Sequence, residues 1–129
     1  MSRNQVFAAG ATLAVVVGLG LGFYQAGSPH LQRLAKADES RVQDLNEISQ
    51  AVRRYHSQNL KLPQYLTELD QIGPPFRIAD PETRAPYEYR TLDERRFELC
   101  AVFATDNRTE VRRVPGDRPH AAGRQCFSF

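Results

Sequence analysis

The sequence predicts an α+β protein in which an N-terminal transmembrane helix precedes an amphipathic helix packed on a small antiparallel sheet of three to four strands. Three observations predict this order. Residues 6–24 contain no charged side chain, and apolar residues then recur at helical spacing as far as Gln58. Alternation typical of strands begins only at Pro86. We therefore expect a transmembrane signal anchor in residues 1–26 and one folded domain in residues 27–129.

The composition excludes one class of partner. The 129 residues include 17 basic and 15 acidic side chains, which gives a formal charge of +2. These charges are spread along the chain, and no basic block with interleaved aromatic residues is present. We therefore expect no nucleic acid partner.

The apolar run has the length of a membrane span, because a helix needs about 20 apolar residues to cross roughly 30 Å of hydrocarbon. Phe23 and Tyr24 stand at its end, where aromatic rings favour the membrane interface. The competing interpretation is a cleaved signal peptide, whose apolar core is shorter and is followed by small residues. Here Tyr24 occupies the exit from the run, so an uncleaved anchor in the lipid bilayer is favoured.

The two cysteines, Cys100 and Cys126, favour a disulfide, since oxidising compartments stabilise such pairs in small exported domains. The alternative is two reduced thiols in a cytoplasmic domain. Basic residues lie on both sides of the apolar run, so the positive-inside rule does not orient it. The expected disulfide orients the run instead, because it requires an oxidising compartment. The C-terminal domain is therefore predicted to be periplasmic, on a single-pass protein of the bacterial cytoplasmic (inner) membrane.

The remaining elements follow from local patterns. The helix that ends near Gln58 is expected to turn its polar face to solvent, a face that carries Arg41, Asp44, Glu47, Arg53 and Arg54. A second short helix is expected over residues 63–72, and residues 105–123 are expected to form a polar loop. Strands are predicted at residues 86–91, 97–103 and 124–129, with Cys126 facing Cys100.

This order of elements resembles the type IV pilins and the pseudopilins of type II secretion. The local phrases are similar too: residues 44–48 followed by Tyr55 and by Leu62-Pro63, and Asp80-Pro81 leading to residues 86–89. The resemblance implies a pilin-like domain. The chain departs from these families at the prepilin peptidase site, because Gly22-Phe23 follows the apolar run and no Glu lies within it. Cleavage of the pilin type is therefore not expected.

Small residues recur every four positions in the apolar run and would line one side of its helix. Such a stripe allows two helix backbones to approach closely in lipid. We interpret it as a contact for another transmembrane helix, from a second copy of the chain or from a membrane protein complex; the alternative is that membrane anchors are rich in Gly and Ala in any case. The stripe comprises Gly10, Ala14, Gly18, Gly22 and Ala26.

No residue pattern predicts catalysis or a cofactor. The histidines His30, His56 and His120 lack metal-ligand spacing and are expected at the surface. No serine lies in a nucleophile-elbow context. Loop carboxylates could bind calcium, although turn capping explains Asp80 and Asp117 more simply; the carboxylates are those of Asp80, Glu82, Asp106, Glu110 and Asp117.

The sequence thus favours a non-enzymatic accessory or assembly subunit that binds a membrane or periplasmic protein partner. A pilus or pseudopilus subunit with an atypical leader is the first alternative. A periplasmic module that binds a small ligand or calcium is the second.

Overall fold

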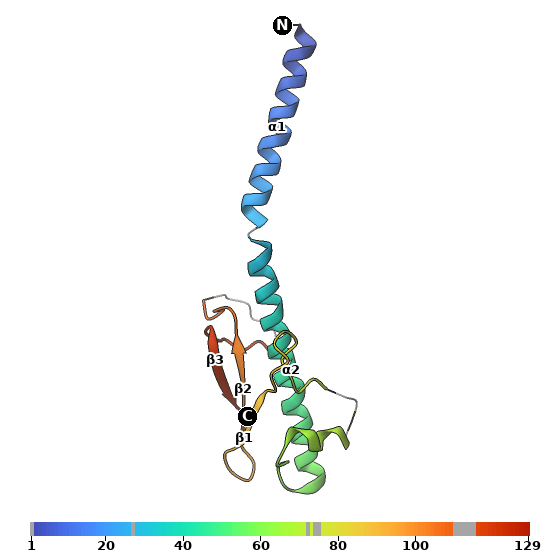
Figure 1. The fold of residues 1–129 in the computed structure, drawn as a ribbon, viewed down its shortest axis with the longest axis vertical. Coiled ribbons are helices and arrows are strands. Elements are labelled where there is room, and N and C mark those ends of the chain that lie inside the picture. Colours follow the sequence, from blue (N-terminus) through green and yellow to red (C-terminus); the bar gives the residue numbers. More distant parts are fainter. Residues whose placement is uncertain (1, 27, 72, 74–75, 110–115) are drawn as a thin grey trace. The chain divides into compact units, whose positions relative to one another are not determined.

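The computed structural model describes residues 2–26, 28–71, 73, 76–109 and 116–129. The chain divides into two compact units, Met1–Arg33 and Leu34–Phe129. An α+β architecture is confirmed: among the described residues, helices come first and a three-stranded antiparallel sheet follows (Figure 1).

Helix α1 (Arg3–Ala26) contains the apolar run. Ser2 precedes the helix, and its backbone N–H donates to Gln5 Oε1 at 2.9 Å, as in half of a capping box. The described part of the chain holds one helix that is long and apolar enough to cross a membrane, judged by length and composition alone. None of its most apolar segment is buried.

Helix α2 (Pro29–Asn59) starts with proline, whose missing N–H costs nothing at a first helical position. It ends one residue beyond the predicted Gln58. Leu60 then adopts φ 57° and donates its N–H to the His56 carbonyl oxygen, which closes the last turn. One face of α2 is buried and supplies Val42, Leu45, Ile48, Ala51 and Val52 to the core.

The second helix is shorter than expected and of another type: η1 (Leu66–Gln71) is a 3-10 helix. Glu68 Oε1 accepts the backbone N–H groups of Gln64 and Tyr65 at 2.8 and 2.9 Å. These residues are thereby held in a turn before the helix instead of forming its first turn.

The sheet has the order β1 (Glu88–Thr91), β2 (Phe97–Phe103), β3 (Gly123–Ser128). In the predicted strand 86–91, Pro86 forms only an isolated bridge with Ala79, so the ladder starts at Glu88. In Figure 1 helix α2 lies beside the sheet. Alternate residues of β2 belong to the same core as the buried face of α2, namely Phe97, Leu99, Ala101 and Phe103.

Candidate functional site

Cys100 and Cys126 are direct partners across the antiparallel pair of β2 and β3. Their Cα atoms lie 4.0 Å apart, and their sulfurs are bonded at 2.12 Å. On the same face, Arg124 makes a bidentate ion pair with Glu88 at 2.8 and 2.6 Å and reaches Cys100 Sγ at 3.6 Å. Glu98 lies close to both sulfurs, but sulfurs bonded to each other offer no thiolate to a metal ion.

The small-residue stripe lies on an open helix surface. At Gly10, Gly18 and Gly22 an added Cβ would meet no atom within 4 Å, and Ala14 is exposed. The Ala26 side chain lies outside the described part of the structure. Contact of this stripe with another helix stays a prediction.

A buried polar cluster of the folded unit centres on Arg41, which is 3% exposed. Its guanidinium pairs with Asp38 at 2.7 Å, with Asp80 at 2.5 Å and with Glu82 at 2.8 Å. The pKa of Arg41 is raised above its usual value, chiefly by the hydrogen bond to Asp80. Asp38 and Asp80 are themselves buried, so two carboxylates inside the fold share the single positive charge of Arg41.

These carboxylates also bind backbone far away in the sequence. Asp38 accepts hydrogen bonds from Ala104 N at 2.9 Å and from Thr105 N and Oγ1 at 2.7 and 2.6 Å. Asp80 Oδ1 accepts the backbone N–H groups of Glu82 and Thr83, which confirms its turn-capping role. The cluster therefore ties α2 to the turn before β1 and to the end of β2.

Asp44, one helical turn further along α2, is buried in a different setting. It accepts a 2.8 Å hydrogen bond from the Tyr87 hydroxyl, and Arg77 lies 3.5 Å away. Burial raises the pKa of Asp44 and outweighs these two contacts. Burial, followed by the bond to Asp44, also raises the pKa of Tyr87.

The prediction that Arg41 and Asp44 lie on a solvated face is therefore wrong, whereas Glu47, Arg53 and Arg54 are exposed. Both buried residues lie beside the apolar stripe of α2, so they turn inward with it. That position was the available signal, because polar side chains at core-facing spacing require buried partners. Asp38, three residues before Arg41, carries the same signal and was missed.

The expected surface position of His120 is also wrong, since this residue is 2% exposed. Its ring stacks on Phe103 with centroids 3.9 Å apart, and Nδ1 lies 3.1 Å from the Thr105 carbonyl oxygen. Its backbone N–H donates to Asn107 Oδ1 at 2.7 Å. The bond between His120 and Asn107 thus links a residue shortly after β2 to a residue shortly before β3. His30 is exposed and His56 is partly buried.

The five carboxylates proposed for calcium do not gather at one place among the described residues. Asp80 and Glu82 bind Arg41, and Asp106 pairs with Arg108 at 2.5 Å. Asp117 lines a small cavity beside His120, and Glu110 lies outside the described residues.

A scan of protein-family models, a search of curated proteins and a search of solved structures each found no match.

Proposed function

We propose that this chain is a non-enzymatic accessory or assembly subunit of the bacterial cytoplasmic membrane that binds a membrane or periplasmic protein partner. The observation that carries the proposal is the exposed apolar surface of α1, where side chains such as Val15, Leu19 and Phe23 are 60%, 58% and 79% exposed. In water, this exposed apolar surface costs about 25 cal/mol per Å². In a bilayer the same surface is favourable, and a helix satisfies its own backbone there.

The disulfide supports a periplasmic position for residues 27–129. Bonds of this kind persist in the periplasm and are rare in the cytoplasm, where thiols are kept reduced. With one span in residues 1–26, the N-terminus is then cytoplasmic. Such a protein presents two surfaces to partners: the helix within the membrane and the folded unit outside it.

A pilus or pseudopilus subunit is the second candidate. It is favoured by a long helix whose buried face packs on a small antiparallel sheet closed by a disulfide. The two candidates differ in processing, because a pilin loses its leader to the prepilin peptidase.

One purification separates these outcomes. The accessory-subunit proposal expects full-length protein in the membrane fraction, resistant to alkaline extraction, with an intact mass that includes residues 1–26. A shortened chain would favour the pilus subunit. Recovery in the soluble fraction after lysis would contradict both.

The small-residue stripe supports a helix contact within the membrane. Replacing Gly18 and Gly22 by leucine should abolish co-purification of the transmembrane partner, because leucine side chains keep the two backbones apart. The matched control is Gly20→Leu. At about 100° per residue Gly20 faces roughly away from Gly18, and its Cβ would also meet open space.

A membrane two-hybrid assay or a detergent pull-down measures this effect. The double variant should lose the signal while Gly20→Leu keeps it. If both variants keep the wild-type signal, the stripe is not the contact. If both variants lose the signal, the loss is a general effect of added bulk.

A further inference from the structure

Asn46 of α2 holds Arg118 in place through a neutral amide. Its Nδ2 donates to the Gly116 carbonyl oxygen at 2.8 Å, and its Oδ1 accepts a 3.1 Å hydrogen bond from Arg118 Nε. Gly116 has φ 89°, a left-handed conformation that glycine adopts without strain. The guanidinium is thus positioned through Nε, and no residue that the structure describes accepts from its two Nη groups.

The same guanidinium lies over two phenylalanine rings at the end of the sheet. Arg118 Cζ is 4.1 Å from the centroid of the Phe129 ring and 5.3 Å from that of the Phe127 ring. The side chain is partly buried there. Contact with aromatic faces restricts the orientation of a guanidinium, so the cation is held in place before any ligand arrives.

The Phe129 ring lies towards the C-terminal end of α2. It stacks on Phe97 with centroids 5.4 Å apart, and Phe97 also packs against Tyr89. The Tyr89 hydroxyl donates at 2.9 Å to the carbonyl oxygen of Pro63, which follows the end of α2. The Arg118 guanidinium above Phe129 is therefore directed towards this end of the helix.

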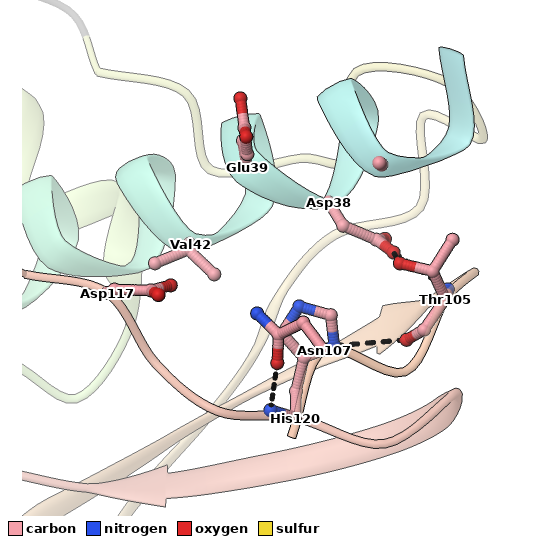
Figure 2. A pocket seen from close by; sticks show the side chains of 8 residues that line it. Asp38, Glu39, Val42, Thr105, Asn107, Asp117 and His120 are labelled. Carbon is pink, nitrogen blue, oxygen red and sulfur yellow. Dashed lines mark hydrogen bonds between the residues drawn. The ribbon is translucent and has the colours of Figure 1, made fainter. Parts of the chain in front are cut away.

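A second cation, Arg53, lies in this direction. It comes seven positions after Asn46 on α2, about two helical turns, so both side chains leave the same face. Burial, and then repulsion from Arg53, lowers the pKa of Arg118. Asp117, the neighbour of Arg118 in the sequence, instead lines the small cavity beside His120 (Figure 2). Within the described ranges, neither arginine forms an ion pair with a carboxylate.

Packing on the rings does not by itself require an arginine at this position. An apolar side chain would cover Phe127 and Phe129 without the cost of removing a charge from water. A bound anion would offset that cost and also the repulsion between Arg118 and Arg53. The arrangement is therefore suited to a negatively charged ligand.

We propose that Arg118 and Arg53 bind an acidic segment of the periplasmic protein partner through one of its carboxylate side chains. This inference rests on the proposed partner-binding function and specifies the chemistry of the contact outside the membrane. The Nη edge of a guanidinium matches the two oxygens of a carboxylate, and such bidentate bonds are stronger than neutral ones. Arginine is also enriched among the residues that contribute most of the binding energy at protein interfaces.

Arginine-selective ¹⁵N NMR of the full-length protein, in micelles of an uncharged detergent, tests the proposal. The probe is the peptide acetyl-(Glu)4-amide, and acetyl-(Gln)4-amide is its uncharged control. The Glu peptide should shift the Nε–Hε resonance of Arg118 saturably, with a midpoint on the order of 1 mM. The Gln peptide should leave this resonance unchanged. The resonance is assigned by its loss in Arg118→Lys.

Arg53→Gln should raise the midpoint for the Glu peptide about two- to five-fold, the effect of an exposed charge. Arg54→Gln is the matched control, because it removes the same charge from the next exposed position of α2. That side chain leaves the helix about 100° away from Arg53, so its loss should not change the midpoint. Both changes are at the surface and should leave the fold intact.

Three results would contradict the proposal: no shift of Arg118 with the Glu peptide, an equal shift with the Gln peptide, or equal midpoints for Arg53→Gln and Arg54→Gln. Tighter binding of inorganic phosphate than of the Glu peptide, at the same ionic strength, would replace the carboxylate with a phosphoryl ligand. Any of these results could occur with a membrane-bound chain of full length. The purification described above therefore tests the accessory-subunit proposal separately.

Discussion

Replacing Arg41 with methionine should lower the free energy of unfolding of the folded unit by about 3–5 kcal/mol, the cost of leaving buried carboxylates without their counter-cation. Methionine retains much of the volume and the helix propensity of arginine, so the effect isolates the charge. Asp38 keeps its bonds to Ala104 and Thr105, but Asp80 loses its bidentate partner. Denaturant unfolding of the full-length protein in detergent, followed by near-UV circular dichroism, measures the loss.

Arg54→Met is the matched control, because Arg54 is exposed on the same helix. Its effect should stay within about 0.5 kcal/mol, as for most surface substitutions. Equal effects at the two positions would show that the cluster does not stabilise the fold.

The same cluster gives a dependence on pH that the Arg41 variant should reduce. Burial alone would raise the pKa of Asp80, but the hydrogen bonds from Arg41, Thr83 and Glu82 outweigh it and lower the pKa to about 2. A lowered pKa stabilises the fold above the unfolded value of about 3.8, and this contribution, about 2 kcal/mol, is lost as the pH falls towards 2. Without Arg41, a smaller part of the stability depends on this pH range.

The helices and strands could be predicted from local patterns, because apolar residues recur at helical spacing in α2 and alternate in β2. The strand predicted at residues 97–103 coincides with β2, and the helix predicted to end near Gln58 ends at Asn59. The errors lie where one side chain overrides the pattern. Pro86 has no N–H for the ladder, and Glu68 binds the amides that would have started a longer helix.

The partners of the buried polar side chains could not be predicted in the same way. The position of Arg41 and Asp44 beside the apolar stripe of α2 signals their burial, but it does not identify their partners Asp80, Glu82 and Tyr87, which lie about 40 residues away. His120 stands in a segment without periodicity, and its burial depends on the Phe103 ring and the Asn107 amide. Such contacts are set by tertiary structure, which residue spacing along one chain does not encode.

Breaking the disulfide should cost the folded unit about 3 kcal/mol, since the bond closes a loop between residues that are 26 positions apart. The most direct comparison is between oxidised and reduced wild-type protein, which differ in that bond alone. Reduction should shift the denaturant midpoint to lower concentration. The double variant Cys100→Ala with Cys126→Ala should start near the reduced protein and show no response to reductant.

The same bond reports the compartment, and therefore the topology. If residues 27–129 face the periplasm, both cysteines should resist thiol alkylation in cells until the protein is denatured and reduced. The Ala variants at each single position supply the control, because each leaves one free thiol that reacts after denaturation without reduction. Alkylation of the wild-type pair without reductant would place the unit in a reducing compartment and reverse the orientation of α1. Because basic residues flank both ends of α1, the charge distribution cannot orient it, and the oxidation state of Cys100 and Cys126 is the physical property that does.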